Sequence, residues 1–359
     1  MPDTPPRPLR VLHWPTDVGG HPSGLAQAER AIGLDSTVAV IGRGPFGYPV
    51  DIDLELGSRT RLARLAGRTG MLLRAMRDFD VIHLNFAQAF WPQVGSLGLD
   101  LPLLRQMGKR IVVTLQGCDA RVPQRCPVCC HGHGPCSLDE SRRRENAVAY
   151  AARHASAVFC LNPDLLETAP GSMFMPYASV DPKAIAQQPT TRQQGGPLRV
   201  IHAPTNRLTK GTQAVIHACE RLGDRVELVL VEGVSRVEAM KVSATGDVVV
   251  DQLRLGWYGG LSVEAMALGR PVVCHLDTNL LAKVPAGLAR ELPIVSANES
   301  GVQDALAQLA QASPAALKEL GDRGRHFVER WHDPVALAQW MAEHYRADCL
   351  PEPFEPRSI

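Results

Sequence analysis

Short, continuously apolar runs recur along this chain and alternate with segments of helical composition. The runs are RVLHW (10–14), TVAVIG (37–42), DVIHLNF (80–86), RIVVTL (110–115), AVFCLN (157–162), RVIHAP (199–204), VELVLVEG (226–233), VVVDQL (248–253) and PVVCHL (271–276). A strand that is apolar along its whole length is typical of a parallel sheet, which is buried on both faces. Segments rich in Ala, Leu, Glu and Arg lie between many of them, such as 24–33, 145–155 and 212–223. The alternation predicts an α/β fold of strand–helix–strand units.

The second half of the chain opens with the same sequence as the first. PLRVLHWPTD (8–17) and PLRVIHAPTN (197–206) are identical at seven of ten positions. The polar, Gln-rich segment 181–197 ends in Gly-Gly-Pro and is typical of a linker. We therefore expect two doubly wound (Rossmann-like) parallel-sheet domains, 1–182 and 183–332, each binding ligand at the carboxyl ends of its strands. The C-terminal segment 333–359 contains a helix that either packs only on the second domain or crosses back to the first.

Composition excludes several classes of protein. A chain of 359 residues with 45% hydrophobic content can bury two cores. The net charge of +1 gives no electrostatic case for a nucleic-acid partner. The N-terminus lacks the apolar core of a signal peptide, and no apolar run is long enough to cross a membrane. We therefore expect a cytoplasmic protein.

The segment GWYGGLSVEAMALGRPVV (256–273) joins two glycines to a short helix and then a buried strand. N–H groups at a helix N-terminus bind phosphate, and glycine lets a ligand approach the backbone, so Gly260, Leu261 and Ser262 are candidate phosphate-binding positions. Glu264, in the first turn, is placed to accept hydrogen bonds from a ribose diol. The alternative is that Glu264 only complements the helix dipole.

Two cations follow the first strand of the second half, in TNRLTKG. Arg207 and Lys210 would lie at the ligand edge of that domain, where they would suit a pyrophosphate. On its own, this R-x-x-K spacing is also typical of a solvated loop. An NAD-dependent oxidoreductase is excluded, because no G-x-G-x-x-G motif follows the first strand.

Together these motifs resemble the GT-B glycosyltransferases, specifically glycosyltransferase family 4. The resemblance rests on NRLTKG, GGLSVEAMALGRPVV, MPYASVD (175–181), DVIHLNF, TLQGCDAR (114–121) and VGG (18–20). It implies two Rossmann-like domains that face a cleft, and a retaining transfer of a sugar from a nucleotide-diphosphate sugar. No catalytic metal and no protein nucleophile are implied. The acceptor would be a glycan, a lipid-linked molecule or a protein, such as a bacterial surface-glycan precursor.

The resemblance also assigns residue roles. Glu264 would hold the ribose, while Arg207 and Lys210 would stabilise the leaving diphosphate. The N–H groups near Gly260, Leu261 and Ser262 would cradle the phosphates. On the acceptor side, the matching positions are Gly19, Gly20, Gln116 and Asp119.

Two positions depart from the family pattern. Gly256 stands where the family has the first of two glutamates, so Asp251 or Gln252 would have to replace its contact with the sugar. Gln116 stands where the family often has a histidine, and the nearby Asp119 either lines the acceptor cleft or is a turn residue. The alternative function is a catalytically silent nucleotide-binding protein that acts as a partner or regulator.

A cysteine-rich insertion, 118–140, contains RCPVCCHGHGPC (125–136). Cys126 and Cys129 have the spacing of a zinc knuckle, and Cys136 is a natural third ligand. The candidates for the fourth ligand are Cys130, His131, His133 and Cys118. The alternatives to structural zinc are free thiols on a surface loop and a redox pair.

The segment SRTRLARLAGRTGMLLRAMR (58–77) has six arginines and no acidic residue. One helical stripe would contain Leu62, Leu65, Leu72, Leu73 and Met76. The segment is either a surface helix on anionic lipid, at the inner face of the membrane, or an ordinary helix with its stripe in the core.

Overall fold

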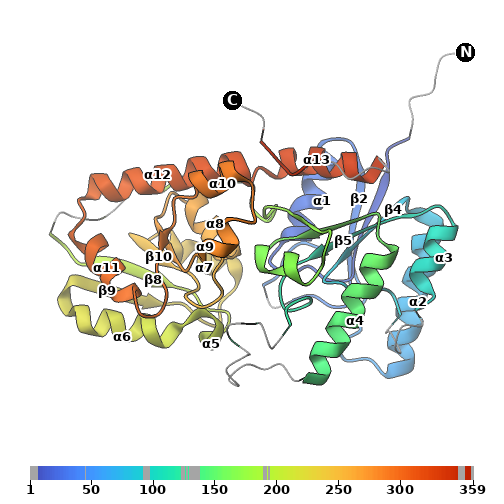
Figure 1. Ribbon diagram of the computed structural model, residues 1–359, viewed down its shortest axis with the longest axis horizontal. Helices are drawn as coiled ribbons and strands as arrows, with labels where there is room; N and C mark the ends of the chain where they lie inside the picture. Colours follow the sequence, from blue (N-terminus) through green and yellow to red (C-terminus); the bar gives the residue numbers. More distant parts are fainter. Residues whose placement is uncertain are drawn as a thin grey trace, which may run out of the picture. The chain divides into compact units, whose positions relative to one another are not determined.

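The computed structural model describes residues 7–44, 46–91, 98–122, 126, 128, 138–188, 192, 195–346 and 352–356. These residues form two compact units. Unit 1 contains the described residues within 1–122, 138–179 and 334–354. Unit 2 contains those within 180–333 and 355–359, together with Cys126 and Val128 (Figure 1).

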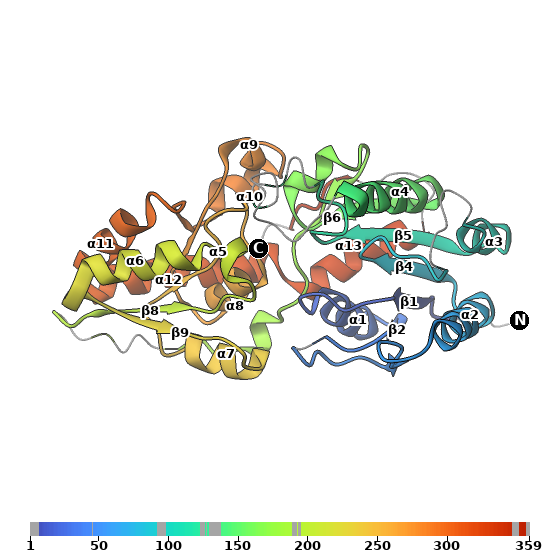
Figure 2. The same cartoon turned by 90° about the horizontal axis from the view of Figure 1, so that it is seen from below.

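Unit 1 is built on a seven-stranded parallel sheet in the order β3-β2-β1-β4-β5-β6-β7. Its strands are β1 (Arg10–Trp14), β2 (Asp35–Val40), β3 (Ile52–Asp53), β4 (Val81–Asn85), β5 (Arg110–Leu115), β6 (Ala157–Cys160) and β7 (Met173–Phe174). Its helices are α1 (His21–Ala31), α2 (Arg61–Asp78), α3 (Asp100–Gln106), α4 (Leu138–His154), the 3-10 turn η1 (Pro163–Glu167) and α13 (Pro334–Arg346). Figure 2 shows helices on both faces of this sheet.

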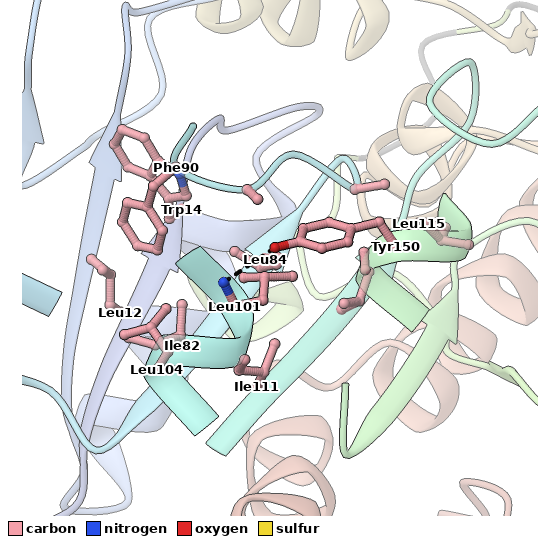
Figure 3. Close-up of a cluster of buried hydrophobic side chains, with 14 of the residues drawn as sticks. Leu12, Trp14, Ile82, Leu84, Phe90, Leu101, Leu104, Ile111, Leu115 and Tyr150 are labelled. Carbon is pink, nitrogen blue, oxygen red and sulfur yellow. Dashed lines mark hydrogen bonds between the residues drawn. The ribbon is translucent and has the colours of Figure 1, made fainter. Parts of the chain in front are cut away.

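The apolar face of this sheet holds the larger core of unit 1. Alternate residues of a strand point to opposite faces, so Leu12 and Trp14 of β1 share a face with Ile82 and Leu84 of β4. Leu101, Leu104 and other side chains of α2, α3 and α4 pack on this face (Figure 3). Trp14 stacks on Phe90 with ring centroids 5.1 Å apart. All of the residues that Figure 3 labels are at least nine-tenths buried.

The opposite face carries a buried polar cluster, here called the Glu29 cluster. Glu29 Oε2 lies 2.9 Å from His13 Nε2 and accepts from Ser36 Oγ at 2.5 Å, and Glu29 Oε1 accepts from Tyr345 Oη at 2.6 Å. His83 Nδ1 lies 2.8 Å from the same Tyr345 oxygen. Because Tyr345 donates its proton to Glu29, it accepts from His83 Nδ1–H. The cluster joins α13 to β1, β2, β4 and α1.

Unit 2 has a five-stranded parallel sheet in the order β12-β11-β10-β8-β9. Its strands are β8 (Leu198–His202), β9 (Val226–Leu230), β10 (Val248–Val250), β11 (Val272–Cys274) and β12 (Val295–Ser296). Its helices are η2 (Pro182–Ala184), α5 (Arg207–Lys210), α6 (Thr212–Leu222), η3 (Gly223–Arg225), α7 (Arg236–Ser243), α8 (Gly260–Ala267), α9 (Thr278–Leu281), α10 (Ala286–Glu291), α11 (Val302–Gln311) and α12 (Pro314–Trp331). Apolar side chains of α6 and α11 form one core with β8, β10 and β11.

Two parallel-sheet domains were expected from the sequence, and this prediction is confirmed. The predicted strands at 10–14 and 110–115 coincide with β1 and β5, and those at 80–86 and 248–253 contain the shorter β4 and β10. Among the described helices, none has both the length and the apolar composition that crossing a membrane requires.

The stripe predicted on 58–77 is divided in the structure. Leu72 is buried and Met76 is partly buried, whereas Leu62, Leu65 and Leu73 are exposed. The helix α2 therefore packs on the sheet with Met71, Leu72 and Ala75 and leaves three leucines exposed to solvent.

Candidate functional site

The candidate site of unit 2 lies where the strand order reverses. β8 is the first strand of this sheet, β9 lies on one side of it and β10 on the other. In open α/β sheets, ligands bind at such a switch point, beyond the carboxyl ends of the strands. The loop after β8 leads into α5, and the loop after β10 leads into α8. These two loops carry the donor-site residues predicted from the sequence.

Local capping explains how Lys210 comes to this edge. Asn206 caps the single turn α5 by accepting from Thr209 N at 2.9 Å, and Gly211 ends it with φ of 69°. The left-handed conformation at Gly211 costs little because glycine has no Cβ. Lys210 is consequently held in the last turn, 8% exposed, facing the loop after β10.

Asp251 is the centre of the site. Its Oδ1 atom accepts from Lys210 Nζ at 2.5 Å, and its Oδ2 atom accepts from Gly259 N at 2.9 Å and Ser262 Oγ at 2.6 Å. Burial opposes ionisation of this fully buried carboxyl, but Lys210, Ser262 and Gly259 outweigh burial and lower the pKa of Asp251. Asp251 therefore forms a buried ion pair with Lys210 and joins the loop after β8 to the loop after β10.

Gln252 extends the same contact network. Its Oε1 atom accepts from Lys210 Nζ at 3.2 Å, and its Nε2 atom donates to the carbonyl of Trp257. Gln252 is 5% exposed. The structure thus brings Lys210, Asp251, Gln252 and Ser262 together, although the sequence prediction gave Asp251 and Gln252 only as substitutes for a missing glutamate.

The N-terminus of α8 has backbone donors available. Gly259 at the N-cap is extended and provides no side-chain cap, and Ser262 N donates to Gly259 O at 3.0 Å. Within the described part of the chain, the N–H groups of Gly260 and Leu261 make no hydrogen bond, and both residues are partly exposed. Uncapped N–H groups at a helix N-terminus attract anions such as phosphate.

Glu264 lies one turn into α8 and is 8% exposed. Burial raises the pKa of Glu264, and the guanidinium of Arg236, which donates to its Oε1 atom, opposes this effect. The sequence prediction missed Arg236, which lies 28 residues away at the start of α7. A ribose diol at Glu264 would have to share the carboxylate with this arginine or displace it.

Arg207 is the more exposed cation of the predicted pair. Its guanidinium forms an ion pair with Glu232, with Nε 2.8 Å from Oε1, and 57% of its side chain is exposed. The Glu232 side chain raises the pKa of Arg207. Arg207 is thus free of the buried cluster, and a phosphate would compete only with an exposed carboxylate.

Unit 1 also has a switch point, between β1 and β4. After β1, Gly19 and Gly20 have φ of 62° and 71°, and a Cβ on Gly20 would lie 2.4 Å from the Tyr48 ring. After β4, Phe86 and Ala87 also have positive φ, of 64° and 46°. Non-glycine residues rarely adopt this conformation, and they do so disproportionately at functional sites. The sequence offered no signal for it.

Gln116 and Asp119 lie in the loop after β5. Asp119 accepts from the N–H groups of Gln116 at 3.1 Å and Gly117 at 2.7 Å. Burial raises the pKa of Asp119 to about 6, although these N–H groups and Arg121 favour the charged form. The Gln116 amide donates to Asn85 Oδ1 at 2.9 Å, and its own Oε1 is buried with no hydrogen-bond partner in the described residues.

The predicted zinc ligands cannot be assembled from the described residues. Cys126 is buried and Cys118 is exposed, whereas Cys129, Cys130, Cys136, His131 and His133 lie outside the described part of the chain. Structural zinc therefore remains a prediction.

Comparison with solved structures identifies the fold. Sucrose-phosphate synthase from Thermosynechococcus elongatus is 16% identical, over 95% of this chain and 98% of that chain, with a TM-score of 0.62. Anabaena HepE, solved in complex with UDP-glucose, is 14% identical over 93% and 98% of the two chains, also with a TM-score of 0.62. A glycosyltransferase from Rickettsia africae is 10% identical over 94% and 98%, with a TM-score of 0.57. This chain has the fold of the GT-B glycosyltransferases.

The matches to known proteins come from structure and not from sequence. No protein-family model matches the sequence, and no curated protein sequence matches it. Membership of glycosyltransferase family 4 therefore remains a proposal, based on the motifs quoted above.

The backbone at Gly256 shows why a glutamate would not fit there. Gly256 has φ of 74°, and a Cβ at this position would lie 3.0 Å from Asp277 Cβ. Asp277 N donates to Gly256 O at 2.9 Å, which fixes this close approach. A side chain would be strained at this φ and crowded by Asp277. The loop between β10 and α8 is thus built around glycine, and contacts with a sugar would have to come from other residues.

Proposed function

We propose that this protein is a nucleotide-sugar-dependent glycosyltransferase that binds the nucleotide-diphosphate part of its donor at the switch point of unit 2. The observation that carries this proposal is the Lys210–Asp251 pair beside the uncapped N-terminus of α8, with Glu264 one turn further on. A buried cation, free N–H groups and a carboxylate in that order suit a diphosphate followed by a ribose.

The solved structure of HepE with UDP-glucose supports a nucleotide-diphosphate sugar as the class of donor. The proposed acceptor is a glycan, a lipid-linked molecule or a protein. The match to a mutant of S. aureus TarM covers 79% of this chain and 59% of that chain, with a TM-score of 0.51. That mutant was solved with UDP, fondaparinux and alpha-GlcNAc-glycerol, which favours a glycan-type acceptor.

In the proposed reaction, the bond between the anomeric carbon and the diphosphate oxygen breaks as the acceptor hydroxyl oxygen attacks. The acceptor proton passes to the leaving phosphate, so attack occurs on the same face and the anomeric configuration is retained. Lys210, Arg207 and the N–H groups of Gly260 and Leu261 would stabilise the negative charge that develops on the diphosphate. Glu264 would orient the nucleotide through its ribose.

The first test is nucleotide binding. UDP, GDP, ADP, CDP and dTDP are titrated separately into the wild type, a Glu264→Gln variant and a Glu227→Gln control, and thermal shift and calorimetry are recorded. Glu227 lies near the amino end of β9 and pairs with Arg199 on the surface, so the control makes the same chemical change away from the site. We expect one nucleotide to stabilise the wild type and the control, by about 2.7 kcal/mol at a hundredfold excess over Kd.

The Glu264→Gln variant should bind the same nucleotide at least tenfold more weakly. If no nucleotide binds the wild type, or if Glu264→Gln and Glu227→Gln bind equally well, the assigned donor site is wrong. A turnover assay with the sugar donor then distinguishes an enzyme from a catalytically silent protein. The silent protein is the second candidate because Gly256 replaces the first glutamate of the family pattern. An enzyme should slowly release free nucleotide from the sugar donor, whereas a silent protein should return the donor intact.

A further inference from the structure

Exposed apolar side chains concentrate on two helices of unit 1. In the described part of the chain, nine large hydrophobic residues are exposed, and six of them belong to α2, α3 or the caps of α3. These six are Leu62, Leu65, Leu73, Leu99, Leu103 and Met107, here called the α2–α3 surface. Leu62 is 80% exposed, Leu99 is 67% and Leu73 is 61%. Leaving so much apolar surface in water is unfavourable unless a partner covers it.

The two helices are neighbours. Trp91 joins them, because its Nε1 atom donates to Thr69 Oγ1 of α2 at 2.9 Å and its backbone N donates to Asp100 Oδ2 of α3 at 2.9 Å. Buried leucines of both helices pack on the same face of the sheet. Both views show α2 and α3 at the same end of unit 1 (Figures 1 and 2).

The apolar residues form a stripe on each helix. Leu99, Leu103 and Met107 are four residues apart, which places them on one side of α3. On α2, Leu62 and Leu73 share one side of the helix, next to the buried side at Met71, Leu72 and Ala75. Leu65 precedes Leu72 by two turns and lies on the same side as Leu72, but near the start of the helix, where it is 46% exposed. Each helix therefore presents large apolar side chains to solvent in addition to those that pack in the core.

Unpaired positive charge accompanies the exposed leucines at the start of α2. Arg59, Arg61 and Arg64 are exposed and form no ion pair within the described residues. By contrast, Asp78 pairs with Arg74 and Arg77 at the other end of α2. The first turns of α2 thus combine unpaired guanidinium groups with the most exposed leucine.

These features select one kind of partner. A second copy of this chain would bring the same arginines together and repel itself. A nucleic acid would engage the arginines but would leave the leucines in water. An anionic bilayer satisfies both, because its phosphates attract the guanidinium groups and its acyl boundary accepts leucine side chains.

We propose that the α2–α3 surface docks unit 1 on an anionic lipid bilayer. Leu62, Leu65 and Leu73 insert at the acyl boundary, and Arg59, Arg61 and Arg64 contact the lipid phosphates. This contact does not depend on the proposed sugar transfer, so the nucleotide-binding experiment and the one below can fail separately.

The test is co-sedimentation with vesicles of phosphatidylcholine alone and of phosphatidylcholine with phosphatidylglycerol, at low and high salt. We expect the wild type to bind the anionic vesicles, and high salt to weaken that binding. Leu62→Ser/Leu73→Ser and Arg61→Gln/Arg64→Gln should each lower the partition coefficient about tenfold. The matched controls are Val237→Ser, which changes an exposed apolar residue of α7, and Arg290→Gln, which changes an exposed arginine of α10.

The control variants and the possible negative results decide whether the proposal stands. The controls should bind as the wild type does, and circular dichroism should show all variants folded, since the replaced side chains are exposed. No binding to anionic vesicles would overturn the proposal, as would equal losses in the controls. Duplex DNA provides the last test. If the wild type binds DNA tightly, only the arginine variant loses DNA binding, and the leucine variant still binds vesicles normally, then the surface is a polyanion site and not a lipid-docking surface.

Discussion

Two buried aspartates, one in each unit, follow a central strand and close the loop beyond it, yet the pKa values of their carboxyls are shifted in opposite directions. Asp119 follows β5 and accepts from the N–H groups of Gln116 and Gly117. Asp251 follows β10 and accepts from Gly259 N–H and the Ser262 hydroxyl. Burial raises the pKa of Asp119 to about 6, whereas the pKa of Asp251 is lowered despite complete burial.

The difference is a cation in direct contact. Lys210 Nζ lies 2.5 Å from Asp251 Oδ1. Arg121 favours the charged form of Asp119 from a distance, but its guanidinium is paired with Asp164, with Nε 2.5 Å from Oδ2. Backbone donors alone do not offset the burial of Asp119. A hydrogen-bonded loop can therefore be held either by a carboxyl that readily takes up a proton or by a permanent ion pair.

The largest expected effect is removal of the cation. Lys210→Met should leave Asp251 as an unpaired buried carboxylate and lower the free energy of unfolding by about 3–5 kcal/mol. Urea unfolding measures this loss, and hydrogen exchange at Val248–Val250 assigns it to unit 2. Binding of the donor nucleotide should also be lost.

A double variant tests the cause of that loss. Lys210→Met/Asp251→Asn removes the charge that Lys210→Met leaves unpaired, so it should be more stable than Lys210→Met alone, without recovering nucleotide binding. If Lys210→Met is as stable as the wild type, the Lys210–Asp251 pair does not hold the two loops together and the contrast with Asp119 disappears.

An intermediate effect is expected from Asp119→Asn, and it should depend on pH. The asparagine Oδ1 can accept from the same two N–H groups but cannot ionise. The pKa of Asp119 is about 6 in the folded protein against an ordinary value of 3.8, so folding favours the protonated form. The resulting stabilisation is fully present below about pH 4 and is lost as pH rises through about 6.

The wild type should accordingly gain stability relative to Asp119→Asn as pH falls from 7 to 4, on the order of 2–3 kcal/mol. Urea midpoints of both proteins across this range measure the gain. A pH-independent difference between the two proteins would show that folding does not raise the pKa of Asp119.

The smallest effect on stability is expected from Arg207→Ala. Its ion pair with Glu232 is exposed, and such pairs contribute about 0–1 kcal/mol. Turnover should nevertheless fall by about a hundredfold, because one of the two cations at the leaving diphosphate is gone. The control is Arg199→Ala, whose exposed pair with Glu227 lies near the amino end of β8 and whose turnover should not change. A stability loss above about 2 kcal/mol would mean that Arg207 is structural, as Lys210 is.

Local patterns predicted most of the fold. The apolar runs gave the parallel strands because burial on both faces removes the polar alternation. Gly259 and Gly269 marked the ends of α8, where an extended N-cap and a φ of 74° occur. The loops after β8 and β10 could be placed together because topology fixes where the carboxyl ends of parallel strands lie.

Long-range pairings could not be predicted in this way. The Arg236–Glu264 pair spans 28 residues, and the Tyr345–Glu29 hydrogen bond spans 316. Neither lies within one helix or strand, so no periodicity reports it. The stripe on α2 was visible in the sequence, but only packing could show that Leu72 is buried while Leu62 and Leu73 are exposed.

The Glu29 cluster has a consequence for the order in which the chain is made. Glu29, His13 and His83 are synthesised early, but Tyr345, which donates to Glu29 and accepts from His83, belongs to α13 near the C-terminus. Until translation reaches that residue, unit 1 on the ribosome has an incomplete buried cluster and an uncovered sheet face. Although domains near the N-terminus usually fold first, here the first unit to emerge would be the last to be completed.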